Sequence, residues 1–142
     1  MTHGLDTSFL VAAEVSSHEE HPVCRAQLVK LLKARDELAL APQVLAEFIH
    51  VVTDPKRFSS PLTLAQAIER AEMWWNATEV LHVFPTAEST LLFLGWLEEH
   101  KLGRKRLLDT MLASTLQAGG VTSVLTLNRG DFAIFGAFTF PK

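Results

Sequence analysis

The chain lacks the features that mark secreted or membrane-spanning proteins. It has a single cysteine, Cys24, which excludes an internal disulfide bond and is typical of a protein in a reducing cytoplasm. Its longest apolar runs, such as residues 9–13 and 91–94, are far shorter than the ~20 residues that a helix needs to span a bilayer. No Lys or Arg precedes the first apolar stretch, so we also expect no signal peptide. Together these absences predict a cytoplasmic protein that makes no contact with a membrane.

The chain also lacks a net basic character. Its 13 Lys and Arg residues are outnumbered by 16 Asp and Glu residues, which gives a formal charge of −3 at pH 7. Taken alone, this charge argues against nucleic-acid binding, because nucleic-acid-binding domains are usually basic. The argument weakens if several acids bind metal ions, since those charges are then neutralised where a polyanion docks. Net charge therefore leaves a nucleic-acid substrate open.

Repeats and low-complexity tracts are absent as well. The 142 residues are 48% hydrophobic with a mean hydropathy of +0.17, so we expect one domain over residues 1–142 with one core. The expected strands are residues 2–5, 38–40, 80–84, 123–127 and 137–140. The expected helices begin near Thr7, His21, Pro42, Thr63, Pro85 and Leu107, with a capping box at Thr63 and Gln66. This alternation predicts an α/β fold with a central parallel sheet flanked by helices.

Acidic residues occur where this fold places its functional sites. Such sites form beyond the carboxyl ends of the strands, and Asp6 and Asp131 lie there. Each also has an ordinary explanation, Asp6 as a helix N-cap and Asp131 as a turn residue beside glycine. Glu47 lies on a helix face of the kind that solvent usually covers. Asp109 is harder to explain, because it flanks an apolar helix face, where a carboxylate is costly unless cations match it.

Four stretches that contain these acids resemble the PIN-domain family, and specifically the VapC-type toxins of bacterial and archaeal toxin–antitoxin pairs. The stretches are LDTSFLV at residues 5–11, LAEF at 45–48, LDTMLAST at 108–115 and LTLNRGDF at 125–132. Each pattern is loose by itself, but four in the same order form a strong signal. The one departure is the first strand, residues 2–5, which is shorter than the apolar run usual in the family.

The resemblance implies the family's α/β sandwich, its ribonuclease activity on RNA and its acidic metal site. The metal site carried over to this chain consists of Asp6, Glu47, Asp109 and Asp131. The accessory polar groups are Thr7 or Ser8 and Asn128. The resemblance also implies an antitoxin protein as a partner.

The chemistry of clustered carboxylates agrees with the resemblance. Neighbouring carboxylates repel one another and stay ionised together only if a cation joins them. An all-oxygen anionic site suits Mg²⁺ or Mn²⁺ rather than zinc, and such ions activate water without a nucleophilic side chain. We expect Asp6, Glu47 and Asp109 to be the main metal ligands, with Asp131 acting through water or a second ion.

Basic residues lie next to the acidic motifs along the chain. They are Lys56, Arg57, Arg104, Lys105, Arg106 and Arg129. One interpretation is contact with RNA phosphates, which sets affinity rather than sequence choice. The other is a solvated surface on which aliphatic stems cover apolar neighbours. Both interpretations stay open at this point.

Two apolar segments are candidates for partner surfaces. Residues 91–97 and the pair Trp74 and Trp75 are apolar around most of a helix turn. Core packing is the commoner reason for such stripes. The apolar residues of 91–97 are too many for one face, however, so we also expect a homodimer, with a further apolar groove for an antitoxin segment.

Other functions fit the residues less well. A phosphohydrolase with an Asp nucleophile typically needs a second Asp two positions on, where this chain has Ser8. A non-catalytic RNA- or protein-binding module of the same fold has no need of acids at all four motif positions. A structure-specific DNA nuclease needs an added DNA-gripping arch, for which this chain is short. A zinc site at His18, His21 and Cys24 has no evident fourth ligand, and Pro22 favours a simple helix start.

Overall fold

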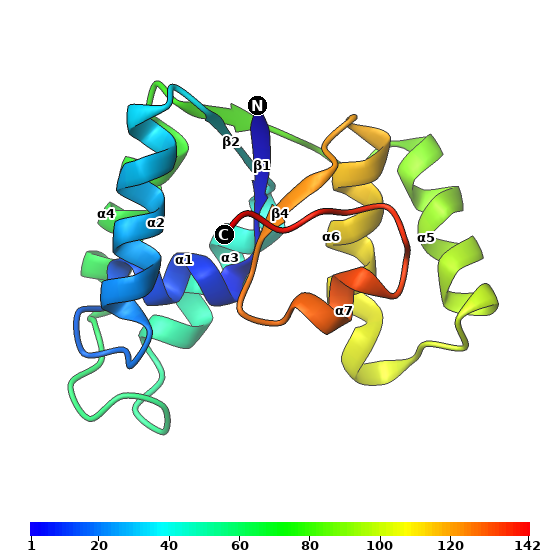
Figure 1. Cartoon of the computed structure of the whole chain (residues 1–142). Helices are drawn as coiled ribbons and strands as arrows, with labels where there is room; N and C mark the ends of the chain where they lie inside the picture. Colours follow the sequence, from blue (N-terminus) through cyan, green and yellow to red (C-terminus); the bar gives the residue numbers. More distant parts are fainter.

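A parallel sheet forms the centre of the molecule. The computed structural model describes residues 1–142, and its strands are β1 (Thr2–Leu5), β2 (Glu37–Leu40), β3 (Val80–His82) and β4 (Ser123–Leu125). The strand order is β3-β2-β1-β4, and each neighbouring pair is parallel. The carboxyl ends of the strands therefore share one edge of the sheet, which faces the lower half of Figure 1.

Helices cover both faces of this sheet. They are α1 (Thr7–Glu14), α2 (His21–Lys33), α3 (Pro42–Val52), α4 (Leu64–Trp75), α5 (Ala87–Glu99), α6 (Leu107–Ala118) and α7 (Arg129–Ala133), with a 3-10 turn, η1, at Arg104–Arg106. In Figure 1, α2 and α4 lie on one side of the sheet, and α5 and α6 lie on the other. The predicted α/β fold with a central parallel sheet is therefore confirmed. No helix has both the length and the apolar character that a bilayer crossing requires.

The start of α4 follows its local sequence signal. The backbone N–H of Gln66 donates to the Thr63 hydroxyl at 3.2 Å, and the Thr63 N–H donates to the Gln66 side-chain oxygen at 3.0 Å. This is the predicted capping box, and it is confirmed. Such signals act within one helical turn, so they do not depend on how the helix packs.

Two strands end earlier than the apolar pattern predicts, and the pairing of the sheet explains why. The pattern predicts strands over residues 80–84 and 123–127, but β3 ends at His82 and β4 ends at Leu125. These two residues pair with the last residues of β2 and β1. The residues that follow have no strand beside them, so the chain leaves the sheet at the carboxyl edge.

The predicted last strand, residues 137–140, is wrong. Thr139 alone forms a bridge, to Ser123 of β4. The segment is bounded by Gly136, whose φ of 65° is left-handed, and by Pro141, which has no N–H to donate. The tail therefore meets β4 at one point and adds no strand to the sheet.

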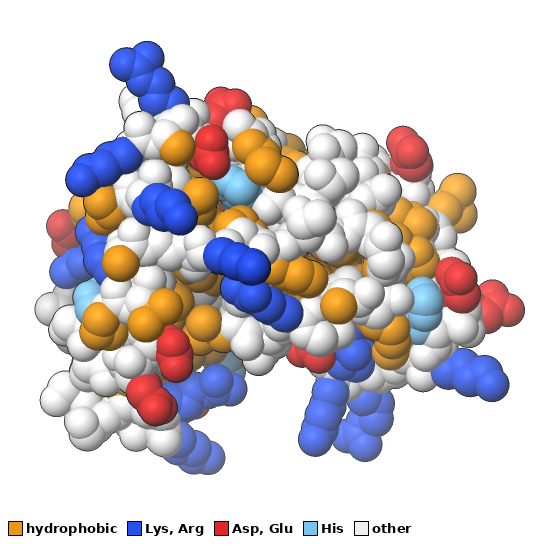
Figure 2. Space-filling view, in the orientation of Figure 1, with side chains coloured by type: hydrophobic (Ala, Val, Ile, Leu, Met, Phe, Trp, Pro, Cys, Tyr) orange, Lys and Arg blue, Asp and Glu red, His pale blue; other side chains and the backbone are white.

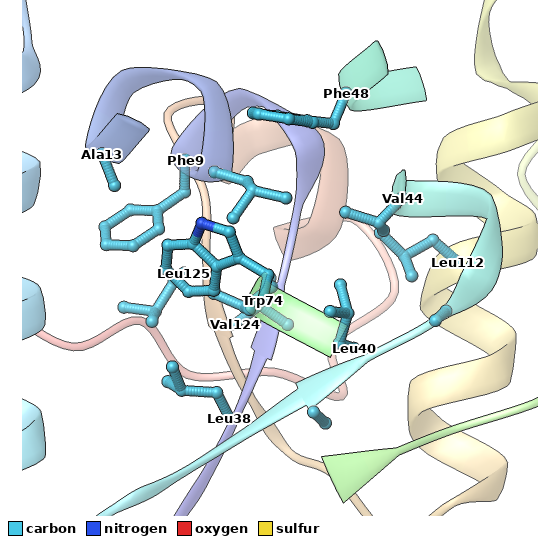
Figure 3. Packing of buried hydrophobic residues seen from close by; sticks show 14 of the residues in the cluster. Phe9, Ala13, Leu38, Leu40, Val44, Phe48, Trp74, Leu112, Val124 and Leu125 are labelled. Atoms are coloured by element: carbon cyan, nitrogen blue, oxygen red, sulfur yellow. The ribbon is translucent and has the colours of Figure 1, made fainter. Parts of the chain in front are cut away.

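The short first strand is a central strand of the sheet. β1 pairs with both β2 and β4, and its last three residues are buried. A Cβ atom on Gly4 would lie 2.5 Å from Cδ1 of Leu116, so the absence of a side chain lets α6 pack closely on β1. Leu116 belongs to the contiguous apolar core, part of which Figure 3 shows. This packing also fixes the position of Asp109, which lies on the same helix.

The two apolar segments divide between the core and the surface. Trp96 is 9% exposed, and its ring stacks on Phe135 with 4.3 Å between the ring centroids. Trp74 is 8% exposed. The interpretation of these two tryptophans as interface residues is wrong, because both pack inside the protomer. The homodimer stays a prediction that rests on Leu91 and Leu94 of α5, which are 72% and 54% exposed.

A buried hydrogen-bond chain holds the amino edge of the sheet. Nδ1 of His3 lies 2.7 Å from the Ser123 hydroxyl, and its Nε2 lies 2.8 Å from Oδ2 of Asp36. The hydrogen bond from His3 is the main reason why the pKa of Asp36 lies below its usual value. A Ser–His–Asp order also occurs in hydrolases, but Ser123 is only 1% exposed, so no substrate reaches its hydroxyl. The three side chains tie β1 to β4 and to the start of β2.

Asp36→Asn is expected to lower the thermal midpoint at neutral pH and to lower it less in acid. Folding lowers the pKa of Asp36, so its carboxylate stabilises the native state above the unfolded-state pKa of about 4. This stabilisation is lost as the pH falls through the folded-state pKa. Thermal melts between about pH 3 and pH 7 test this, with the exposed neighbour Glu37→Gln as control. A midpoint difference that stays constant in acid would contradict this role of Asp36.

Candidate active site

Three of the four predicted acids line one cavity at the carboxyl edge of the sheet. Asp6 follows β1, Glu47 lies on α3, and Asp109 lies in the first turn of α6. The cavity has a volume of about 530 Å³. Its walls also include the three predicted accessory residues, Thr7, Ser8 and Asn128. The structure thus brings together side chains that are more than 120 positions apart in the sequence.

Asp6 is both the N-cap of α1 and part of the cavity wall. Its Oδ1 accepts the backbone N–H of Thr7, the first residue of α1, at 2.9 Å. Its Oδ2 accepts hydrogen bonds from the hydroxyls of Ser8 at 2.9 Å and Thr126 at 2.7 Å. Burial raises the pKa of Asp6 above the usual value, and these hydrogen bonds oppose that rise. Asp6 is therefore held in one orientation at the cavity.

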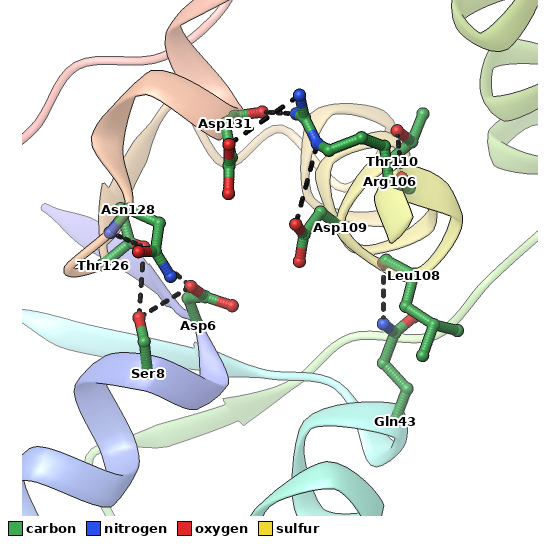
Figure 4. Close-up of polar contacts among 10 residues, drawn as sticks. All are labelled: Asp6, Ser8, Gln43, Arg106, Leu108, Asp109, Thr110, Thr126, Asn128 and Asp131. Carbon is green, nitrogen blue, oxygen red and sulfur yellow. Dashed lines mark hydrogen bonds and ion pairs between the residues drawn. The ribbon is translucent and has the colours of Figure 1, made fainter. Parts of the chain in front are cut away.

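Glu47 is held by Thr7 of α1 and by Gln43 of its own helix, α3. Its Oε2 accepts a hydrogen bond from the Thr7 hydroxyl at 2.9 Å, and its Oε1 accepts one from the Gln43 amide at 3.2 Å. The same Gln43 amide donates to the backbone oxygen of Leu108 at 3.0 Å. These bonds join α1, α3 and the start of α6 around the cavity. Figure 4 shows the contact between Gln43 and Leu108.

Asp109 shows the electrostatic character of the site. Desolvation by burial is the main cause that raises its pKa to about 6. The negative charges of Asp6, Asp131 and Glu47 raise this pKa further, and Arg106 lowers it. The carboxylates therefore repel one another, and Arg106 alone does not balance their negative charge.

Asp131 lies beside the cavity and not in its wall. It belongs to the first turn of α7, and Figure 4 shows it with Asp6 and Asp109 around a common open space. Its Oδ1 lies 3.8 Å from Nη1 of Arg106, whose Nε lies 3.8 Å from Oδ2 of Asp109. Nη2 of Arg106 donates to the backbone oxygen of Asp131. One guanidinium therefore lies between two of the predicted metal ligands.

The donor set of this site fits a hard divalent cation. Its donors are carboxylate oxygens with accessory hydroxyl and amide oxygens, which Mg²⁺ and Mn²⁺ prefer and zinc does not. No three His, Cys, Asp or Glu side chains are gathered closely enough to bind one ion as they stand. Asp6, Glu47 and Asp109 therefore line a shared space without forming an assembled metal site.

The alternative zinc ligands are not assembled. Nδ1 of His18 accepts the backbone N–H of Glu20 at 3.0 Å, and Nδ1 of His21 lies 2.8 Å from the backbone oxygen of Ala12. Cys24 is buried in the core. His18 instead lines the acidic cavity, and Nδ1 as an acceptor places the proton of the neutral ring on Nε2.

The predicted basic residues do not form one patch. Arg57 lines the cavity, and Arg106 lies between Asp109 and Asp131. Arg104, Lys105 and Lys56 are exposed. Arg129 instead contacts the C-terminal tail, with its guanidinium 5.9 Å from the centre of the Phe140 ring. Figure 2 shows Lys and Arg side chains projecting on both sides of a hollow in the lower rim.

Sequence reasoning missed three residues of the site. Thr126 directly follows β4, and the shared carboxyl edge that singled out Asp6 applies equally to it. Gln43 lies four positions before Glu47, the spacing at which helical side chains meet. Phe58 lines the cavity from the segment between α3 and α4, and no pattern in the sequence marks it.

The sequence of this chain matches a known protein family and a known relative. The model of the PIN domain matches residues 5–136. Ribonuclease VapC24 of Mycobacterium tuberculosis is 28% identical over 141 residues, which is 93% of this chain and 90% of the relative.

Solved structures share the fold at lower identity. The sarcin-ricin-loop-cleaving toxin VapC20 of Mycobacterium tuberculosis superimposes with a TM-score of 0.72 at 19% identity, covering 96% of both chains. VapBC2 of Rickettsia felis, bound to a promoter DNA fragment, gives a TM-score of 0.69 at 20% identity, covering 99% of this chain and 98% of its own. The family match over residues 5–136, which holds all four acids, shows that the chain belongs to the PIN domain family.

Proposed function

We propose that this chain is a divalent-cation-dependent endoribonuclease of the VapC type, the toxin of a toxin–antitoxin pair. The observation that carries the proposal is the cavity that Asp6, Glu47 and Asp109 line together, where burial and then the neighbouring carboxylates raise the pKa of Asp109 to about 6. Family membership and the 28% identity to a ribonuclease support RNA hydrolysis as the reaction. Such a cavity attracts a divalent cation, and the cation in turn attracts a phosphodiester.

In this proposal Asp6, Glu47 and Asp109 hold Mg²⁺ or Mn²⁺, and Asp131 acts through water or a second ion. A bound ion of this kind activates a water and stabilises the leaving oxygen of the phosphodiester. The protein's own hydrogen bonds orient the ligands. Ser8 and Thr126 hold Asp6, and Thr7 and Gln43 hold Glu47.

The RNA strand is proposed to enter along the rim that carries the basic residues. Arg57 lies at the cavity itself. Lys56 is its neighbour in the chain, and Arg104 and Lys105 lie on the turn that precedes Asp109, so we propose these exposed side chains as further sites for phosphate contact. Arg129 is occupied by the tail, so we assign it the smallest part in RNA binding. The acids thus perform the chemistry, and the basic side chains supply affinity.

The proposed partner is an antitoxin protein, in keeping with the likeness to VapBC2. A mainly apolar groove of about 310 Å³ between α3 and α4 provides a surface for an apolar antitoxin segment. Leu45, Ile49 and Trp75 are among its lining residues. Leu45 and Ile49 each lie two positions from Glu47 on α3, so the groove and the acidic cavity use different faces of the same helix.

Two variants test the proposed reaction. Asp6→Asn and Asp109→Asn are expected to fold and to lose metal-dependent RNA cleavage, because each removes a carboxylate from the metal site. Removing a residue that only hydrogen-bonds to a metal ligand typically lowers metal affinity or activity by about 10- to 100-fold. We expect a larger loss of activity when a ligand itself is removed. Cleavage of RNA and of DNA is measured with and without Mg²⁺, with the exposed Glu98→Gln as control. Full activity in either Asp variant would remove the metal-site assignment.

Asp109→Asn is further expected to raise the thermal midpoint of the metal-free protein above about pH 6. The pKa of Asp109 is about 6 when folded and about 4 when unfolded, so the folded state binds more protons between these values. Wild-type stability therefore falls as the pH rises from about 4 to about 6, whereas the amide does not titrate. Thermal melts in EDTA across this range measure the effect. If the midpoint of Asp109→Asn already exceeds that of the wild type by the full amount at pH 4, the negative charge of Asp109 is not the cause of the difference.

The exposed basic side chains are tested through the salt dependence of RNA binding. Replacing Arg104 and Lys105 with Ala is expected to reduce the slope of log affinity against log salt by roughly 0.7 for each lost phosphate contact. Lys30 and Lys33, exposed on α2 toward the amino edge of the sheet, provide a matched pair of Ala substitutions that should leave the slope unchanged. Equal slopes in both double variants would show that Arg104 and Lys105 do not contact RNA.

A further inference from the structure

Arg106 differs from the two basic residues that precede it. All three form η1, the turn that leads into α6. Arg104 and Lys105 are exposed, whereas the Arg106 side chain is 24% exposed and turns inward toward the acids. Figure 4 shows its guanidinium extended between Asp109 and Asp131.

The guanidinium is held by the backbone and not by the carboxylates. Nη2 of Arg106 donates a hydrogen bond to the backbone oxygen of Asp131. The carboxylate oxygens of Asp109 and Asp131 both lie 3.8 Å from guanidinium nitrogens, which is too long for a hydrogen bond. Nε of Arg106 is buried and has no hydrogen-bond partner. The positive charge is therefore fixed beside two carboxylates that remain free to turn away from it.

A role of Arg106 in joining η1 to α7 does not by itself explain where its guanidinium lies. An unpartnered buried N–H is unfavourable, and backbone contact between η1 and α7 requires only Nη2. The remaining nitrogens face the side chains of Asp109 and Asp131. Neither of these two carboxylates forms an ion pair with any other Lys or Arg. The charge of Arg106 is thus directed at the carboxylates themselves.

We propose that Arg106 is an internal counter-cation which neutralises Asp109 and Asp131 in the metal-free protein and which competes with the divalent cation for them. This inference rests on the proposed function, because it takes these acids to be metal ligands. Asp109 and Asp131 exchange the loose 3.8 Å contacts with Arg106 for coordination, while the hydrogen bond to the Asp131 backbone keeps the guanidinium in place. Arg106 is in this account a positioning residue that sets the affinity of the site for metal.

The first test is a calorimetric titration of the full-length protein with Mn²⁺, without RNA. Arg106→Gln is expected to bind Mn²⁺ roughly three- to tenfold more tightly than wild type, because a fixed like charge next to the ion is removed. Lys105→Gln removes the same charge from the same turn without an acid contact, so its affinity should stay within about twofold of wild type. Arg106→Lys keeps the charge and should stay close to wild type. Equal or weaker binding by Arg106→Gln would overturn the proposal.

The second test uses thermal stability as an independent readout. If Arg106 neutralises the acids only when metal is absent, Arg106→Gln lowers the thermal midpoint in EDTA and lowers it much less in saturating Mn²⁺. The same loss in both conditions would identify Arg106 as a structural clamp and overturn the proposal. Suppose the wild type hydrolyses RNA with Mn²⁺, but Arg106→Gln neither binds Mn²⁺ more tightly nor loses more stability in EDTA than in Mn²⁺. This result would overturn the inference about Arg106 and leave the proposed function in place. A wild type that binds no Mn²⁺ would remove both.

Discussion

The mutual repulsion of the carboxylates at the carboxyl edge is the constraint on which the rest of the site depends. Burial is the main cause that raises the pKa of Asp109, and the negative charges of Asp6, Asp131 and Glu47 raise it further. The hydrogen bonds around the cavity hold these charges close together, through Thr126 and Ser8 on Asp6 and through Thr7 and Gln43 on Glu47. Neighbouring carboxylates repel one another, and the divalent cation proposed above would offset that repulsion.

The fold keeps the repelling groups in place by fixing the elements that carry them. The absence of a side chain at Gly4 lets Leu116 of α6 lie against β1, so the helix that carries Asp109 packs directly beside the strand that leads to Asp6. At the opposite edge, His3 joins β1 to β4 through Ser123 and to the start of β2 through Asp36. This polar network therefore holds together, at their amino ends, the same strands that lead to the acidic cavity at their carboxyl ends.

The sequence predicted the features that depend on short-range patterns and on strand ends. The capping box at Thr63 and the position of Asp6 after β1 are of this kind. Features that depend on tertiary contacts were not predictable. Trp96 belongs to an apolar run that is too long for one helix face, yet a partner from the tail, Phe135, covers it. The inward turn of Arg106 beside exposed Lys105 is likewise decided by the approach of α7, which no local pattern encodes.

RNA hydrolysis by the wild-type protein in EDTA, Mg²⁺ and Mn²⁺ tests most directly whether these carboxylates act through a bound cation. Single-stranded DNA of the same sequence serves as a second substrate. We predict endonucleolytic cleavage of RNA with either cation, none in EDTA, and recovery when the cation is restored after chelation. Equal cleavage in EDTA would contradict the central claim that these carboxylates act through a bound cation, and cleavage of DNA in preference to RNA would contradict the assignment as a ribonuclease.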